Sequence, residues 1–90
     1  MGMVILIIKI MPNSAGANLS EIKSSAEREM LNLGAKSITF EEKPIAFGLI
    51  ALYLKMALPE EKGTDIVETI LSKIADVSSV TIEDYISAFG

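Results

Sequence analysis

Four segments of the chain have the hydrophobic pattern of β-strands. Met3 to Met11 and Ile45 to Leu58 are almost continuously apolar, which predicts long strands with at least one buried face. Apolar and polar residues alternate from Ser37 to Glu42, as in a strand with one face in water. Val80 to Tyr85 predicts a last strand.

Two further segments have apolar residues at helical spacing. The first begins at Asn18, a good N-cap residue, with Glu21 three positions later as in a capping box. Gly34 is placed to end this helix. The second begins with Thr64 as its N-cap. The apolar stripes are Leu19, Ile22, Ala26, Met30 and Leu33 in the first helix, and Ile66, Val67, Ile70, Leu71 and Ile74 in the second.

The predicted order of elements is βαββαβ, which favours one α+β fold. Its usual solution is the ferredoxin-like sandwich, a four-stranded antiparallel sheet with two helices on one face. The 90 residues suffice for one core, so residues 1–90 are expected to form a single domain. Glu41 to Pro44 is polar and ends in proline, and a turn or an irregular connection is expected there.

Strand parity predicts which side chains point away from the helices. The polar residues of the strands mark that face, and with them come Ile5, Ile7, Phe47, Leu49 and Tyr53. An exposed apolar patch of this kind usually marks a contact surface. A merely exposed sheet and a dimer interface remain alternatives. The polar residues used for this assignment are Lys9, Thr39, Glu41, Lys55, Thr81 and Glu83.

Composition removes several classes of function. The chain has no cysteine and no histidine, so thiol catalysis, histidine-activated serines and most zinc sites are excluded. The formal net charge of −4 disfavours direct binding of nucleic acid. The longest apolar run, Ile45 to Leu54, is shorter than the roughly 20 residues that span a bilayer. We therefore expect a cytoplasmic protein that is not an enzyme, with no cofactor, metal or membrane contact.

One segment, Phe40 to Leu49, is distinctive. Phe47 follows a proline and directly precedes Gly48, so its ring can project outward rather than pack. Spacing alone leaves open that Phe47 is a core residue at the edge of the sheet.

With this segment included, nearly the whole sequence resembles the archaeal elongation factor 1-beta proteins. The most specific part is the block Glu42-Lys43-Pro44-Ile45-Ala46-Phe47-Gly48-Leu49. The start Val4 to Pro12, the Gly63-Thr64 helix start and the closing Val80 to Asp84 support it by order and spacing.

The resemblance implies a guanine-nucleotide exchange factor that promotes exchange of GDP for GTP on the translation GTPase elongation factor 1-alpha. It implies that Phe47 inserts near the nucleotide site, with Lys43, Pro44, Ile45, Gly48 and Leu49 beside it. Phe89 in the tail is added as a further candidate for partner binding. Eukaryotic members of the family also use a lysine near the C-terminus to disturb the magnesium site. The corresponding position is Gly90, so the resemblance does not extend to that step.

Three other functions fit a ferredoxin-like domain. A small-molecule sensor is expected beside an enzyme or a DNA-binding domain. An RNA-binding sheet needs stacking aromatics and a basic surface. An acylphosphatase-like enzyme needs an arginine in a phosphate-binding loop, and the one arginine, Arg28, falls on a predicted helix. A small-molecule or protein-interaction module is the alternative we retain.

Overall fold

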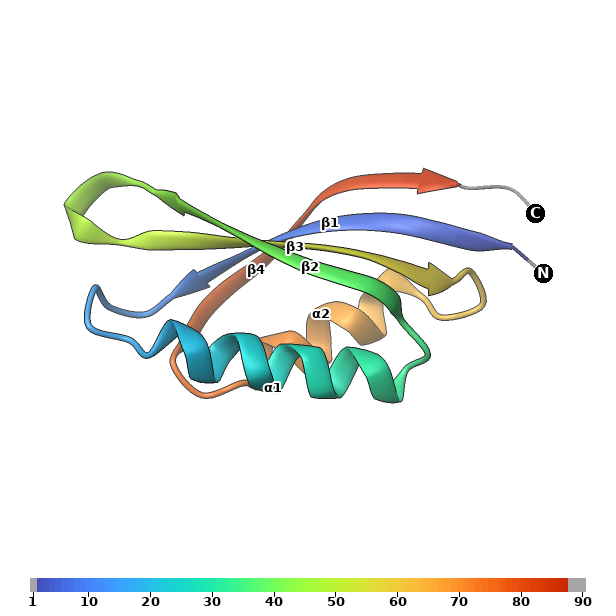
Figure 1. The fold of residues 1–90 in the computed structure, drawn as a ribbon, viewed down its shortest axis with the longest axis horizontal. Coiled ribbons are helices and arrows are strands. Elements are labelled where there is room, and N and C mark those ends of the chain that lie inside the picture. The colour runs from blue at the N-terminus through green and yellow to red at the C-terminus, as the bar shows by residue number, and fades with distance from the viewer. Residues whose placement is uncertain (1, 88–90) are drawn as a thin grey trace.

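The computed structural model describes residues 2–87 and shows the predicted βαββαβ order (Figure 1). A short 3-10 turn, η1, lies between the second and third strands. The bounds are β1 Met3–Pro12, α1 Leu19–Asn32, β2 Lys36–Pro44, η1 Ala46–Gly48, β3 Ile50–Pro59, α2 Thr64–Ser72 and β4 Val77–Ser87.

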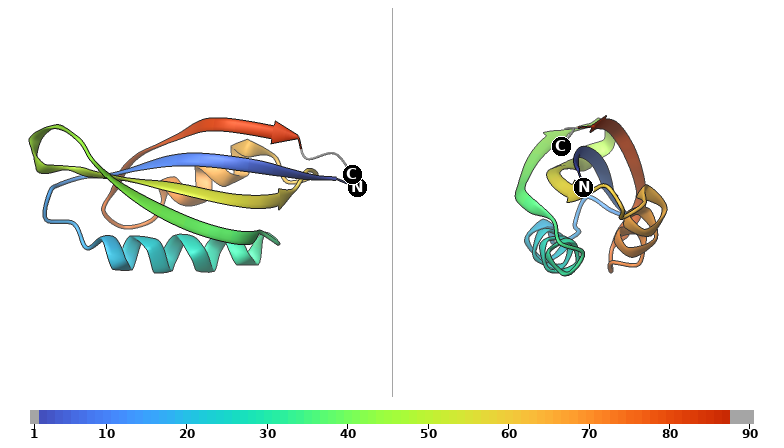
Figure 2. Two further views of the ribbon diagram at one scale, coloured as in Figure 1. Left: turned by 45° about the horizontal axis from the view of Figure 1, so that its top comes forward. Right: turned by 90° about the vertical axis from the view of Figure 1, so that its right-hand side faces the viewer.

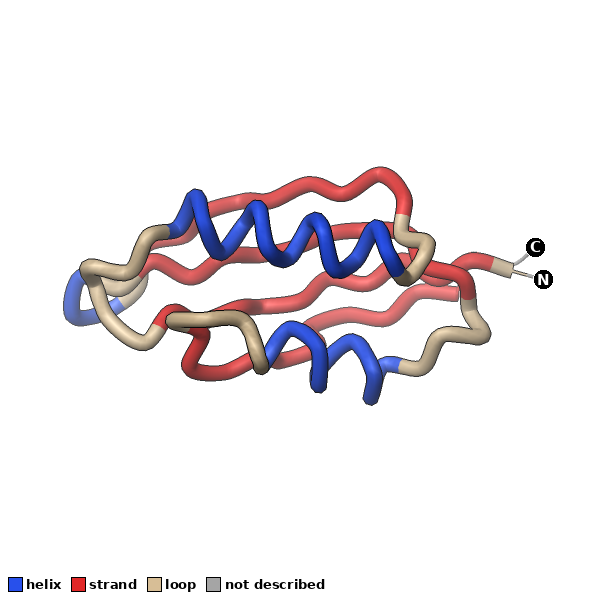
Figure 3. The backbone as a smooth tube through the Cα atoms, turned by 90° about the horizontal axis from the view of Figure 1, so that it is seen from below, coloured by secondary structure: helices blue, strands red, loops and turns tan. Residues whose placement is uncertain are grey.

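The four strands form one antiparallel sheet in the order β2-β3-β1-β4. Both helices lie on the same side of it (Figures 1 and 3). Seen end-on, the sheet curls over the two helices (Figure 2, right). The ferredoxin-like α+β fold predicted from the sequence is thereby confirmed.

A single hydrophobic core lies between the sheet and the helices. The two central strands supply most of it, because every second residue of β1 and β3 points toward the helices. Among the described residues, no polar or charged side chain is buried. The largest fully buried side chains are Val4, Leu6, Ile8, Ile10, Ile22, Met30, Leu52, Leu54, Met56, Leu58, Val67 and Leu71.

Both ends of α1 are capped as the sequence predicts. The Asn18 Oδ1 accepts a hydrogen bond from the Glu21 N–H at 3.1 Å. At the other end Gly34 has φ +94°, a left-handed conformation that glycine adopts without steric cost. The Gly34 N–H then donates to the Leu31 carbonyl, and the Ala35 N–H to that of Met30. This pair of bonds is a Schellman motif, which turns the chain into β2.

Four predicted boundaries were wrong. Residues 41–44 belong to β2 rather than to a turn, and β3 begins at Ile50 rather than at Ile45. Gly63, not Thr64, is the N-cap residue of α2, and no side chain caps it. β4 is longer than predicted and begins at Val77.

The sheet surface that faces away from the helices is called the open face below. Antiparallel partners share a face, so Ile5, Ile7, Lys9 and their partners in β3 lie on it, as parity predicts. A register shift between Ile7 and Ile8 interrupts this rule on β4. It places Asp84 opposite Ile7, because a β-bulge adds one residue and reverses the parity beyond it.

Candidate functional site

The β2–β3 hairpin reaches beyond α1 at one end of the molecule (Figure 1). Its strands pair up to Pro44 opposite Ile50. The Ile45 N–H donates a hydrogen bond to the Leu49 carbonyl at 2.8 Å, and the Leu49 N–H donates to the Ala46 carbonyl at 3.3 Å. These bonds fix the backbone of residues 45–49, which we call the tip.

Phe47 is held outward at this tip. Its side chain is 95% exposed, the most of any large hydrophobic residue described. Its backbone has φ +63° and ψ +27°, the left-handed region, which costs a residue with a Cβ about 1–2 kcal/mol. Gly48 follows at φ +75°. An apolar ring in strained backbone and without packing is the kind of outlier that motivates a functional hypothesis.

This geometry corrects the predicted location of Phe47. Parity placed it in a strand, on the open face, together with Leu49. Instead it lies in η1, outside the sheet, because Gly48 permits the left-handed turn that separates β2 from β3. The alternative that Phe47 is a core residue is also wrong, since the side chain touches almost nothing of its own chain.

The neighbours of Phe47 form a small apolar surface around the tip. Pro44 ends β2, an edge strand, where a residue without an N–H costs no ladder hydrogen bond. Ile45 is 36% exposed, and Leu49 is half-buried. The structure thus brings together all the predicted site residues of the hairpin, including Lys43. Phe89 lies outside the described residues.

A second loop lies at the same end of the molecule as the tip (Figure 3). A Cβ built on Gly48 would lie 3.6 Å from the Cβ of Ala15, in the loop between β1 and α1. That loop is itself tied to the connection before β4, since the Asn13 N–H donates to the Asp76 carbonyl at 2.8 Å. The tip therefore lies next to the β1–α1 loop, which this hydrogen bond holds to the connection before β4.

Comparison with known proteins identifies the family. The sequence model of a family described as the EF-1 guanine nucleotide exchange domain matches residues 5–86. The chain belongs to this family. Three relatives named elongation factor 1-beta are similar over nearly their full length. The one from Methanobrevibacter smithii is 41% identical over 93% of this chain and 94% of its own. Those from Natronomonas pharaonis and Haloarcula marismortui are 36% and 38% identical, covering 93% and 92% of this chain and 96% and 94% of their own.

Family membership directs attention to surfaces that can hold a protein partner. Besides the tip, the open face has a contact that sequence reasoning missed. The Lys43 Nζ lies 4.5 Å from the centre of the Tyr53 ring, a cation–π geometry. The polar segment Glu41 to Pro44 predicts a turn at Lys43, so the sequence pattern does not place this residue beside β3. The strand alternation of residues 37–41, continued by two positions, would have indicated it.

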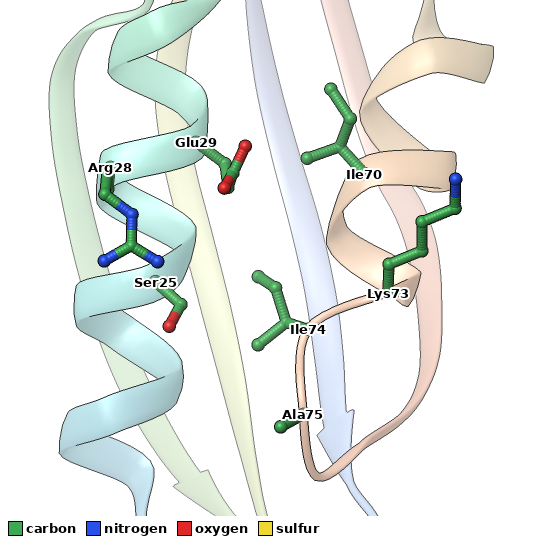
Figure 4. Close-up of a pocket in the computed structure, with 7 residues that line it drawn as sticks. All are labelled: Ser25, Arg28, Glu29, Ile70, Lys73, Ile74 and Ala75. Atoms are coloured by element: carbon green, nitrogen blue, oxygen red, sulfur yellow. The ribbon is translucent and has the colours of Figure 1, made fainter.

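A hollow of about 360 Å³ lies between α1 and α2. Figure 4 shows Ser25, Arg28 and Glu29 on the α1 side, facing Ile70, Ile74 and Ala75 across it. The wall is a mixture of aliphatic and solvated charged groups.

Residues 2–87 contain no group of three or more aspartate, glutamate, histidine or cysteine side chains that could hold a metal ion. Neither α1 nor α2 is long and apolar enough to cross a bilayer.

Proposed function

We propose that this chain promotes the exchange of GDP for GTP on elongation factor 1-alpha by inserting Phe47 into a pocket of that GTPase. It acts as a binding partner rather than as an enzyme, and residues 1–90 work as one exchange domain in the cytoplasm. The carrying observation is the Phe47 side chain, 95% exposed on a hydrogen-bonded tip.

An exchange factor works through differential affinity. It must bind the nucleotide-free GTPase more tightly than the GDP-bound form, because only a difference in affinity shifts an equilibrium. The coupling is reciprocal, so GDP weakens binding of the factor by the same ratio. A projecting ring suits this scheme, because it gains buried area only in the state whose pocket is open.

The size of the ring sets the scale of the effect. A phenylalanine buries roughly 150–250 Å² when it fills a pocket, which at about 25 cal/mol per Å² is a gross gain of about 4–6 kcal/mol. The two hydrogen bonds that close the tip preserve more of this gain than an unstructured loop would, since less ordering is needed on binding. In the complex, Ile45 and Leu49 at the two ends of the tip would form part of the rim that excludes water from the contact.

The test is release of fluorescent GDP from elongation factor 1-alpha, with and without the protein. Phe47→Ala is expected to weaken transition-state binding by about 2 kcal/mol or more, the range of interface hot spots. Leu31→Ala is the matched control, since Leu31 is an exposed apolar residue (55%) on α1, away from the tip. Wild-type protein that leaves GDP release unchanged contradicts the exchange function. Equal behaviour of the two variants contradicts the role of Phe47.

A further inference from the structure

Three lysines converge on one tyrosine of the open face. Lys9 is the direct cross-strand partner of Tyr53, and Lys55 lies two residues after Tyr53 on the same face of β3. The Lys43 Nζ lies over the Tyr53 ring from the other side, on β2. We call Lys9, Lys43, Lys55 and Tyr53 the lysine–tyrosine cluster.

The charges of this cluster are little neutralised within the chain. Lys43 has a loose, exposed pairing with Glu41, with 3.7 Å between Nζ and Oε1. Within residues 2–87, Lys9 and Lys55 form no salt bridge. A hollow of about 360 Å³ between β2 and β3 is lined by two of these lysines, the tyrosine and one carboxylate; the lining residues are Ile7, Thr39, Phe40, Glu41, Lys43, Tyr53 and Lys55. A partner can therefore reach the Lys43 and Lys55 ammonium groups and the Tyr53 ring from one side.

The opposite side of the molecule has the opposite charge. The two helices that cover the other face of the sheet carry five carboxylates and only two cations (Figure 3). Although the chain has a net charge of −4, its open face carries the three lysines of the cluster against the two carboxylates Glu41 and Asp84. The helix residues concerned are Glu21, Glu27, Glu29, Asp65 and Glu68 against Lys23 and Arg28.

We propose that the lysine–tyrosine cluster docks on a carboxylate-bearing surface of the GTPase and orients the approach of the tip. This inference rests on the proposed function. Lys43 connects the two surfaces, because it belongs to the same hairpin as Phe47. Charge separated between two faces steers association, since an acidic partner is attracted by one face and repelled by the other.

The remaining composition of the open face favours a protein surface over RNA. Glu41 lies opposite Tyr53, and Asp84 lies opposite Ile7, so charges of both signs are interspersed on this face. A nucleic-acid-binding surface is instead strongly positive, because every phosphate carries a negative charge. Ile5 and Ile7 add aliphatic area without stacking capacity. A folded partner with carboxylates and apolar patches fits this mixture.

The experiment measures association with nucleotide-free elongation factor 1-alpha by stopped-flow fluorescence at several salt concentrations. The test variant is the double substitution Lys9→Glu with Lys55→Glu. The control is Lys62→Glu with Lys73→Glu, which changes net charge equally at exposed positions just outside the two ends of α2. Circular dichroism of both variants checks that they fold. A milder pair, Lys9→Gln with Lys55→Gln, repeats the test if the Glu pair does not fold.

The test variant is expected to associate about tenfold more slowly at low salt, within the range of electrostatic steering. The difference should shrink toward 1 M salt, where the Debye length is only about 3 Å. The control should change the rate by less than about threefold. A test variant that associates as fast as wild type overturns the inference, and so does an equal slowing of both variants.

Two further readouts separate this inference from its alternatives. If wild-type protein does not accelerate GDP release, the proposed function fails, whatever the lysines do. If it accelerates release and Phe47→Ala abolishes the effect, but the lysine variants associate normally, only the docking proposal fails. Lysine-dependent binding of a fluorescent single-stranded RNA at physiological salt, with unchanged association to the GTPase, also overturns it.

Discussion

The helix-covered face of the sheet and the tip of the β2–β3 hairpin use apolar side chains in opposite ways. On the helix-covered face, Leu6, Ile8 and Leu54 are fully buried in the chain's own core. At the tip, Phe47 is 95% exposed in a left-handed backbone conformation. The two regions are close in sequence, since the tip joins β2 to β3 and β3 contributes Leu54 to the core.

The contrast separates residues that make the fold from residues that it presents. A buried leucine stabilises the folded state, and removing it also leaves a cavity. An exposed phenylalanine in strained backbone adds little to stability and can lower it. Selection for folding alone favours the first arrangement and gives no reason for the second.

The sharpest test compares Leu54→Ala with Phe47→Ala in urea unfolding. Leu54 lies in β3 opposite Ile8, at the centre of the core. Its truncation should lower the free energy of unfolding by about 2–5 kcal/mol. Phe47→Ala should change it by less than about 0.5 kcal/mol, because the ring has almost no contacts to lose. A loss above about 1.5 kcal/mol for Phe47→Ala would mean that the ring packs on its own chain.

The second test exploits the left-handed backbone of the tip. Phe47→Gly should raise the free energy of unfolding by up to about 1 kcal/mol, since glycine adopts this conformation without a Cβ penalty. Gly48→Ala should lower the free energy of unfolding by about 1 kcal/mol, because φ +75° is strained for a residue with a Cβ. The new Cβ adds no clash, since it would lie 3.6 Å from the Cβ of Ala15, an ordinary contact. Opposite signs at adjacent positions sharpen the comparison.

The same Phe47→Gly variant should lose exchange activity while gaining stability. The measurement pairs the urea midpoint with the rate of fluorescent GDP release. A variant that is both less stable and fully active would contradict the division between fold-making and partner-binding residues.

The core and the tip also differ in how far the sequence predicts them. The side chains of β1 and β3 that form the core are predictable, because successive strand residues point to opposite faces and Lys9 and Lys55 mark the outer face. The cap of α1 at Asn18 and its end at Gly34 follow from local chemistry, and both are confirmed.

The hairpin boundary was not predictable from the same pattern. Residues 45–49 are apolar or small, like the strand that follows, so periodicity continued β3 through them. The turn depends on left-handed backbone at Phe47 and Gly48, and nothing in the pattern of residue 47 indicates that conformation. For β4, the bulge beside Ile7 reverses parity, and a sequence-based alternation does not detect an inserted residue.

The smallest expected effect concerns an ion pair between the helix layer and the strand that leads to the tip. Lys23 of α1 donates to the Glu42 Oε2, on the part of β2 that leads to the tip. Both side chains are partly exposed (33% and 43%), so the pair should contribute less than about 1 kcal/mol. Glu42→Gln is therefore expected to lower the free energy of unfolding by about 0.5 kcal/mol at low salt, and by less at 1 M salt.

The control for this pair is Glu41→Gln, which removes the looser contact with Lys43 on the same strand. It should have no measurable effect on stability. Because the tip is closed by its own hydrogen bonds between Ile45 and Leu49, Glu42→Gln should also leave GDP release within about twofold of wild type. A larger loss of exchange with unchanged stability would show that the helix layer positions the tip, and the two regions would then no longer be separable.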